Sequence, residues 1–416
     1  MRVLGLLVAV GRLVAGSMLF SPAEARADDT LATHDDLQRR DGDSSETERA
    51  GELGTRVASK VAVYTDDDGL TVITPIISVT QKIHDRTSLG VEYDADVLSA
   101  ATVDVRTAAT DKFQEVRHGL ALSATHRVRA WETDLTGAIS LSREADYASA
   151  TFSGGFASDF LEKNVTVGGG YSYVISAVGR AKTPFSNFLD TLHIHAISLS
   201  FTQILSPRTY FQLSGSAIGA VGYQGSVYRY VPLFLEGQVD PADVTETSLR
   251  SGGVHPLYRP AEQVPRTRYR GAAVARVNHA FPFRLTLSAD YRFYADSWAV
   301  TSHTADVSAY QRLPLGLILR LRNRFYYQTS ASFYQRVYTV ASPGELPELY
   351  TTDRELGTFW YDLVGLKLAI EVPVSPTFER LVLDVKGDLQ FTKYLDFAYL
   401  PDRMAVVFGA GVLVEL

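Results

Sequence analysis

The stretch FRLTLSADYRFYADSW, residues 283–298, alternates apolar and polar side chains from one position to the next. One face carries Phe283, Leu285, Leu287, Ala289, Tyr291 and Phe293, and the other carries Arg284, Thr286, Ser288, Asp290, Arg292 and Tyr294. Successive side chains of a β-strand point to opposite faces, so the stretch predicts a strand well beyond the ~5–6 residues usual in soluble sheets. Such a strand needs an apolar environment on one face and water or paired charge on the other.

The composition of the chain excludes several classes of protein. It has 416 residues with 46% hydrophobic side chains and a net charge of -7, which is typical of a folded chain. It contains no cysteine, so a disulfide scaffold and a thiolate metal site are both excluded. The mildly acidic balance argues against a nucleic-acid partner, which would require a basic face.

The N-terminus has the pattern of an export signal. Arg2 precedes the apolar run VLGLLVAV, and Ala25-Arg26-Ala27 has the small-x-small form of a cleavage site. We therefore predict a signal peptide at residues 1–27, in preference to a membrane anchor, because Gly11 and Arg12 interrupt the apolar segment. Residues 28–55 are polar and acidic without an apolar period, which predicts a disordered periplasmic lead-in.

Period-2 alternation dominates residues 56–416, and the chain beyond the signal has no run of ~18 apolar residues that could form a transmembrane helix. The pattern predicts about sixteen strands. Their expected ranges are 56–65, 69–82, 87–97, 115–127, 131–143, 148–158, 162–175, 191–204, 208–219, 266–279, 282–295, 299–312, 315–328, 355–370, 378–393 and 403–416.

Connection length separates a membrane barrel from a soluble β-sandwich, which would show similar alternation. The long connections, such as 98–114, 220–265 and 329–354, all occupy odd positions in the order, whereas the even connections are short. Outer-membrane barrels have an even number of antiparallel strands, long extracellular loops and short periplasmic turns. The sequence therefore predicts an all-β transmembrane antiparallel barrel over residues 56–416 in the outer membrane of a Gram-negative bacterium.

Several stretches resemble an uncharacterised family of Gram-negative proteins, defined by a domain of unknown function and predicted to be outer-membrane barrels. The stretches are VYTDDDGLTV (63–72), DADVLSAATVDV (94–105), LSFTQILSPRTY (199–210), GYQGSVYRYVPL (222–233), YRFYADSWAVTSHT (291–304) and RFYYQTSASFY (324–334). The last two carry the resemblance most specifically. It implies the fold and the location, but it brings no activity and no site residue.

Charged side chains share the polar face of the later strands. By parity we expect these to line the lumen: Arg268, Arg270, Arg276, Arg284, Asp290, Arg292, Asp306, Arg320, Arg322, Arg324, Asp384, Lys386 and Asp388. An arginine surface can select anions in a pore. Alternatively, charges of both signs form cross-strand salt bridges that stiffen the wall, and the interleaving of the two signs favours this second interpretation.

Other polar groups have simpler explanations than a site. Glu92, Asp94 and Asp96, with the turn 66–69, could bind Ca²⁺ through carboxylate oxygens, but Asp-Gly is also a common hairpin turn. His193 and His195 share a face without a third metal ligand, which favours an interfacial position. The motifs of serine hydrolases, zinc proteases and phosphate loops are absent from the sequence, so we expect neither an enzyme nor a cofactor.

The connection 220–265 is too long for a passive turn. Its first half is aromatic, and we expect Tyr223, Tyr228, Arg229 and Tyr230 to fold inward and constrict the lumen. The alternative is an external lid or a receptor surface. The most economical function is passage of a small polar solute, for which an anion is one candidate. The second is a non-conducting structural or adhesive barrel whose loops bind a partner. The other expected partners are outer-membrane lipid and the barrel assembly machinery.

Overall fold

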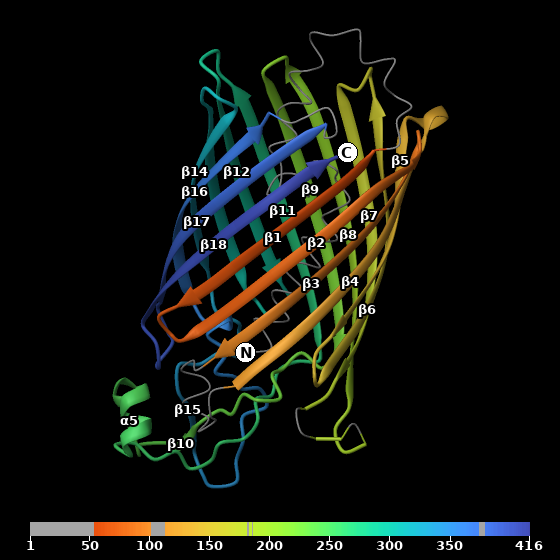
Figure 1. Ribbon diagram of the computed structural model, residues 1–416. Coiled ribbons are helices and arrows are strands. Elements are labelled where there is room, and N and C mark those ends of the chain that lie inside the picture. Colours follow the sequence, from red (N-terminus) through yellow and green to blue (C-terminus); the bar gives the residue numbers. More distant parts are fainter. Residues whose placement is uncertain (1–53, 101–112, 181–182, 185, 374–378) are drawn as a thin grey trace.

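The computed structural model describes residues 54–100, 113–180, 183–184, 186–373 and 379–416. These residues form a closed antiparallel barrel of sixteen strands, shown in Figure 1. The predicted all-β barrel is confirmed. The predicted signal peptide and almost all of the acidic lead-in lie outside the described residues, except that Thr55, expected at the end of the lead-in, begins the first strand.

Each predicted strand corresponds to one strand of the barrel, and two short strands and a few helical turns lie in the loops. The barrel strands are β1 (Thr55–Asp66), β2 (Leu70–His84), β3 (Thr87–Ala100), β4 (Phe113–Val128), β5 (Thr133–Arg143), β6 (Tyr147–Phe160), β7 (Val165–Val178), β8 (Asp190–Ser206), β9 (Thr209–Gly222), β11 (Thr267–Ala280), β12 (Leu285–Asp296), β13 (Thr301–Arg312), β14 (Leu317–Gln328), β16 (Phe359–Val372), β17 (Arg380–Tyr394) and β18 (Asp402–Glu415). The loop elements are η3 (Arg129–Trp131), β10 (Leu233–Leu235), η4 (Pro241–Asp243), α5 (Glu246–Ser251), β15 (Tyr338–Val340) and η5 (Arg354–Leu356).

The sheet closes because its first and last strands pair with each other. β1 and β18 run antiparallel over the register Arg56↔Glu415 to Asp66↔Ala405. Backbone hydrogen bonds beyond the paired strands extend the seam, since the Thr55 N–H donates to the Leu416 carbonyl at 3.0 Å. Closure leaves no strand edge with unpaired backbone groups, which is the condition for β-structure in a lipid bilayer.

The two faces of the wall differ in the way that the alternation predicts. The side chains that point outward are apolar and exposed, with Leu122 at 52%, Leu199 at 62% and Val364 at 59%. Aromatic side chains on this outer face gather toward both ends, with Tyr269 and Tyr291 near the long loops and Trp131 and Phe283 near the short turns. An apolar band between two aromatic girdles is the outer surface of a barrel in a membrane.

Several predicted strands begin too early because a left-handed residue ends the preceding turn. The strand expected from residue 131 begins at Thr133, since Trp131 belongs to η3 and Glu132 has φ 45°. Ala299 and Leu315 have φ values of 67° and 65°, and they likewise delay β13 and β14. A positive φ cannot continue a pleated strand, and the hydrophobicity of these residues concealed the turns.

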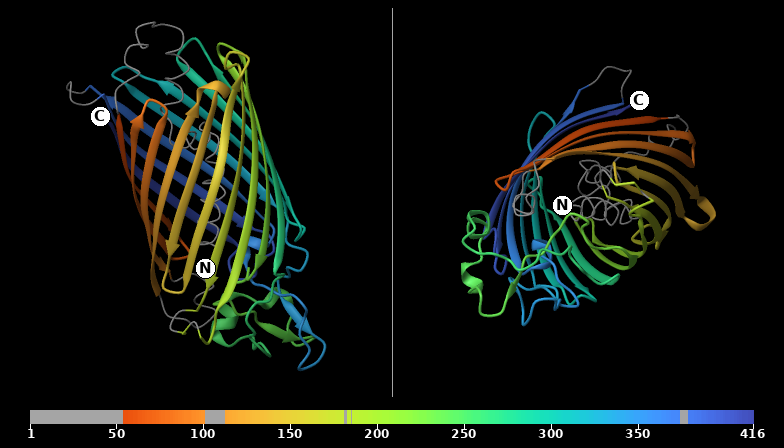
Figure 2. Two further views of the ribbon diagram at one scale, coloured as in Figure 1. Left: turned by 90° about the vertical axis from the view of Figure 1, so that its right-hand side faces the viewer. Right: turned by 90° about the horizontal axis from the view of Figure 1, so that it is seen from below.

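The loops are sorted by length between the two ends of the barrel, as Figure 2 shows. The short connections 85–86, 129–132, 161–164, 207–208, 281–284, 313–316 and 373–379 share the end at which β1 begins and β18 finishes. The long connections 223–266 and 329–358 share the other end with α5, β10 and β15. Within the described residues, no helix has the length and apolar character needed to cross a membrane.

An arginine substitution should destabilise the barrel on its outer face and be tolerated on its inner face. Leu122→Arg places a guanidinium on the apolar face near the middle of β4, and we expect it to lower the free energy of unfolding by ~2–4 kcal/mol. Ala121→Arg is the matched control, because Ala121 faces inward and its cross-strand partner is Glu92. Urea unfolding of the barrel refolded in lipid vesicles measures both. Equal losses for the two variants would contradict the assignment of the faces.

Candidate functional site

The predicted lumen residues, with one exception, lie on strands and point to the inner face. They are Arg268, Arg270 and Arg276 on β11, Asp290 and Arg292 on β12, Asp306 on β13, Arg320, Arg322 and Arg324 on β14, and Asp384, Lys386 and Asp388 on β17. Their neighbours at alternate positions, such as Tyr269, Phe325 and Val385, are exposed on the outer face. Whether a solute passes along these side chains stays a prediction.

Arg284 is the exception, and its expected place on a strand is wrong. The structure puts it in the short turn 281–284, where it is exposed and has φ 61°. β12 begins at Leu285, one residue later. The alternation of the sequence continues through the turn without interruption, so the pattern alone gave no sign that the pleat had ended.

The inner face of β11–β14, β16 and β17 carries a surplus of positive charge. Its cations are Arg268, Arg270, Arg276, Arg292, Arg312, Arg320, Arg322, Arg324, Lys367, Arg380 and Lys386, and its carboxylates are Asp290, Asp296, Asp306, Glu371, Asp384 and Asp388. Eleven cations therefore face six carboxylates, a surplus of five. Sequence reasoning missed five of these residues, although the alternation in LVGLKLAIEV was sufficient to place Lys367 and Glu371 on the inner face. The five are Asp296, Arg312, Lys367, Glu371 and Arg380.

The carboxylates of this wall hold cross-strand ion pairs. Arg276 binds Asp290 at 2.6 Å, and Asp306 accepts from Arg322 at 2.6 Å and from Arg324 at 2.5 Å. The predicted salt-bridge ladder is therefore present. However, Arg270 and Arg292 form no ion pair with any described residue, so the ladder does not neutralise the wall. The salt-bridge interpretation therefore applies to the paired residues, and the anion-selectivity interpretation stays a prediction.

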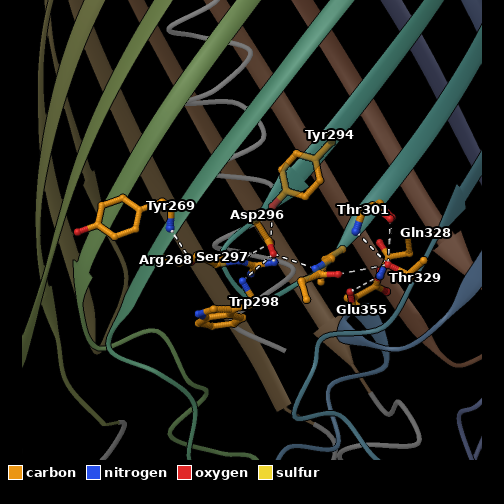
Figure 3. A network of polar contacts seen from close by, with 12 residues as sticks. Arg268, Tyr269, Tyr294, Asp296, Ser297, Trp298, Thr301, Gln328, Thr329 and Glu355 are labelled. Carbon is orange, nitrogen blue, oxygen red and sulfur yellow. Dashed lines mark hydrogen bonds and ion pairs between the residues drawn. The ribbon is translucent and has the colours of Figure 1, made fainter.

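Asp296 organises the hairpin between β12 and β13, as Figure 3 shows. Its Oδ1 accepts hydrogen bonds from the backbone N–H groups of Trp298 and Val300 at 2.9 and 3.0 Å. Its Oδ2 accepts from Arg268 Nε at 2.8 Å and from the Tyr294 hydroxyl at 2.7 Å. The Arg268 guanidinium also lies 4.1 Å from the centre of the Trp298 ring. The stretch YRFYADSWAVTSHT, which is distinctive in sequence, therefore builds a rigid turn.

The aromatic part of the loop 223–266 packs against the inner face of the wall. Val227 belongs to one apolar cluster with the inward-facing Val174, Ile194 and Ile218, and Tyr223 and Tyr228 pack against this cluster. β7, β8 and β9 thus present an apolar inner patch near the long-loop end, and the loop covers it. Tyr223 and Tyr228 therefore contact the inner face of the wall, and constriction of the lumen by this segment stays a prediction.

The polar groups of the same segment bind other loops. The Tyr228 hydroxyl donates to Asp146 in the turn after β5, and Tyr230 accepts from Arg180. Arg229 is buried, with Nη1 3.2 Å from Glu262 Oε2 and 3.1 Å from Asp353 Oδ2. The expected constriction residues therefore also tie the loop 223–266 to its neighbours.

A second loop, 329–358, completes this assembly, which we call the loop cap (residues 223–266 and 329–358). β10 and β15 form a parallel pair between the two loops. Glu262 accepts from the Thr351 hydroxyl at 2.7 Å, and Arg354 binds Asp68 of the hairpin β1–β2 at 2.5 Å. Both partners of this last pair are almost fully buried. The loop cap is therefore held to the rim at the hairpin β1–β2 by a buried charge pair, whose loss is costly.

Tyr338 serves as a hydrogen-bonding centre within the loop cap. Its hydroxyl donates to the Phe333 carbonyl at 2.8 Å and accepts from the Thr351 and Gln335 N–H groups at 3.1 and 3.2 Å. Burial raises the pKa of the Tyr338 hydroxyl, although the two N–H donors oppose the shift. The group therefore remains a neutral donor at physiological pH.

The carboxylates considered for Ca²⁺ are engaged in the protein. Arg117 Nε donates to Asp96 at 2.7 Å, and the same guanidinium pairs with Asp94. In the turn of the hairpin β1–β2, Asp66 accepts from the Leu70 N–H at 2.9 Å. These contacts favour the turn interpretation. Elsewhere, Glu115, Glu144 and Asp146 bring carboxylate oxygens within 4.8 Å of one another, but all three have other interactions.

The two histidines expected at an interface lie on the outer face. His193 Nδ1 is 2.7 Å from the Tyr173 hydroxyl, and His195 Nδ1 is 2.7 Å from the Tyr171 hydroxyl. Matching outward pairs join Tyr93 to His118 and Tyr291 to His303. The histidines therefore belong to the aromatic girdle on the side of the long loops.

The comparisons with known proteins support a family but no activity. The family described as "Protein of unknown function (DUF3570)" matches residues 106–382, and the chain belongs to it. This confirms the resemblance found in the sequence. A search of the curated proteins found no match.

Solved structures of similar shape are outer-membrane proteins at low identity. The structure titled "Bacterial polysaccharide outer membrane secretin" is 8% identical over 88% of this chain and 99% of its own, with a TM-score of 0.46. The CymD monoaromatic hydrocarbon channel is 11% identical over 88% and 89%, with a TM-score of 0.41. CdiB from Acinetobacter baumannii is 8% identical over 87% and 60%, with a TM-score of 0.47. No function is transferred from this likeness.

Loss of the ion pairs of the buried Arg229 should open the loop cap. Arg229→Met leaves the Glu262 and Asp353 carboxylates without this cation, which we expect to destabilise the loop by ~3–5 kcal/mol. The chain has no cysteine, so Val227→Cys reports the opening by maleimide labelling, with a rate increase of at least about a hundredfold. Arg250→Met removes an exposed pair with Glu246 and is the control. Unchanged labelling of the Arg229 variant would refute this role for the ion pairs.

Proposed function

We propose that this protein is a channel of the Gram-negative outer membrane that passes small polar solutes and prefers anions. The observation that carries the proposal is the surplus of five cations on the inner face of β11–β14, β16 and β17. A basic wall in a water-filled lumen attracts anions and repels cations, because charge rings of one sign set the selectivity of pores. Barrels of sixteen strands are wide enough to hold an aqueous channel.

The proposed orientation follows from the two ends of the barrel. The long loops would face the exterior and the short turns the periplasm, as in other barrels of this class. The apolar band between the girdles would contact outer-membrane lipid, and export through the predicted signal peptide would deliver the chain to the barrel assembly machinery.

The second candidate is a non-conducting barrel whose external loops bind a partner. The loop cap favours it, because the buried Arg354–Asp68 pair fixes the loop 329–358 to the rim and the buried Arg229–Asp353 pair joins the two loops. A rigid external surface of this kind suits recognition of a partner. The two candidates differ in one property, which is whether ions cross the barrel in its resting state.

Ion flux through the barrel, refolded in a planar bilayer, tests the proposal. We expect steady conductance and a reversal potential in a KCl gradient that reports chloride preference. Arg270→Gln with Arg292→Gln removes two of the five surplus charges and leaves no carboxylate without an ion-pair partner, so chloride preference falls while the fold persists. Arg276→Gln with Asp290→Asn removes one cation and one carboxylate, and we expect unchanged selectivity.

Folded and inserted protein without conductance would overturn the channel and favour the partner-binding barrel. Heat-modifiable migration in electrophoresis verifies insertion before each recording. Conductance with cation preference would retain a channel but reject the role given to the arginines.

A further inference from the structure

A carboxylate stands on the apolar outer face of the barrel at Asp362. The alternation of β16 points it outward together with Trp360 and Val364, the neighbouring outward positions on the same strand. Its register partners are Phe325 on β14 and Phe391 on β17, which are both exposed on the outer face. An ionisable side chain among apolar neighbours on the outside of a membrane barrel is costly, and such positions usually have a function.

Within the described residues, Asp362 has a neutral partner and no ion pair. Its Oδ1 accepts a hydrogen bond from Asn323 Nδ2 at 2.6 Å. Lys393, the outward cation on the neighbouring strand β17, binds Asp402 at 3.3 Å instead. The described barrel strands carry two outward carboxylates, Asp362 and Asp402, so Asp362 is the one of the two that binds no cation. A carboxylate has several acceptor positions, and Asp362 therefore has capacity for a further donor.

Asn323 extends this polar patch into the apolar band. It points outward from β14, two outward positions from Tyr327 toward the short-turn end. Its register partners are the exposed Val307 on β13 and Val364 on β16. We call Asn323 and Asp362 the outer polar pair. Polar side chains within a membrane serve as contacts between protein surfaces, because lipid tails offer them no hydrogen bond.

A hydrogen-bond donor of the same outer face lies on β13. His303 points outward in the girdle at the long-loop end, and its Nδ1 is 2.6 Å from the Tyr291 hydroxyl. When that hydroxyl donates to Nδ1, the proton of the neutral imidazole is on Nε2, and the charged imidazolium carries one there as well. His303 therefore presents an N–H group that its contact with Tyr291 does not use. An imidazole donor complements the carboxylate of Asp362 in hydrogen bonding and in charge.

The donor and the acceptor lie on either side of β14. β13 and β16 are the two neighbours of β14 in the closed strand order. His303 shares a register row with Tyr327 and Trp360, and Asp362 is the next outward position on β16. Two copies that are inserted in one membrane with the same orientation are related by an axis along the membrane normal. An axis over β14 sets β13 of one copy against β16 of the other, so each His303 meets an Asp362.

Small side chains beside this patch let a second copy come close. Ala289 on β12 and Ala305 and Ala309 on β13 all point outward. Association within a membrane gains from close packing and from hydrogen bonds between protein surfaces, since the lipid tails are as apolar as the surface that they cover. The face therefore offers both contributions, which are close approach at β13 and a polar contact at β16.

We propose that the outer face of β13, β14 and β16 is the interface of a homodimer. Each Asp362 accepts a hydrogen bond from His303 of the other copy, and the interface is isologous, with two equal contacts across the axis. The occupant of this face is a second copy of the chain, because the face carries both halves of the contact. Since the contacts lie outside the lumen, the dimer is compatible with either candidate function.

Single cysteines test the interface directly, because the chain has no cysteine of its own. Phe325→Cys places a thiol on β14 beside the proposed axis. Ile139→Cys places one on the exposed outer face of β5, eight places away in the closed order, and is the control. A short bis-maleimide is added to the full barrel in outer-membrane vesicles. We expect Phe325→Cys to form a crosslinked dimer at least about tenfold faster than Ile139→Cys, since an interface raises the effective concentration of the second thiol.

Variants of the two polar groups test the contact itself. Asp362→Leu and His303→Phe, each combined with Phe325→Cys, should slow crosslinking about tenfold, as loss of one charge-assisted hydrogen bond predicts. The two changes together should add little to either one, because both remove the same contact. His118→Phe removes the equivalent outward pair with Tyr93 and should have no effect. Heat-modifiable migration in electrophoresis verifies that every variant is folded.

Equal crosslinking through the two cysteines would overturn the proposal, as would undiminished crosslinking in both the Asp362→Leu and the His303→Phe variants. Native mass spectrometry of the lipid-embedded barrel gives an independent measure. We expect dimers that become monomers in the Asp362→Leu variant, and monomers at every concentration of the unchanged chain would reject the dimer. A crosslink from Phe325→Cys to a different protein would assign this face to that protein and reject the second copy.

Discussion

Closure of the barrel by the β1–β18 pairing is the constraint on which the rest of the structure depends. Every strand then has two neighbours, so the backbone satisfies its own hydrogen bonds and the outer side chains are free to be apolar. Closure also creates an outer and an inner environment. The odd or even position of a residue along its strand decides which of the two its side chain faces. This explains how one chain presents Leu199 on the apolar outer face of β8 and directs Arg276 of β11 and Asp290 of β12 inward.

The interior created by closure serves two structural purposes. Ion pairs such as Arg276–Asp290 join adjacent strands. The buried Arg229–Asp353 pair joins the two loops of the cap, and the buried Arg354–Asp68 pair joins the cap to the rim. Buried pairs tend to fix geometry more than they add stability. The inner face of β11–β14, β16 and β17 also carries five more cations than carboxylates, and the proposed function uses this feature.

Family resemblance and functional chemistry fall on different parts of this chain. The stretch around Asp296 is distinctive in sequence, and its side chain caps a tight hairpin and receives Arg268. The stretch GYQGSVYRYVPL leads into β10 and contains the ion-paired Arg229. Both are therefore explained by the construction of turns and of the loop cap. The register neighbours Arg320, Lys367 and Lys386 have no comparable sequence signature, because they lie on three separate strands.

The sequence by itself determined the barrel, the sixteen strands, the sorting of loops and the inward face of most charges, because alternation has a strict period of two. It could not detect turns whose residues continue the alternation, which misplaced Arg284. Tertiary structure alone decided which cations became neighbours. The row Arg320–Lys367–Lys386 depends on strand register, and the cap pair Arg354–Asp68 joins residues 286 positions apart. Register and loop docking result from packing and closure over the whole chain, which no local pattern encodes.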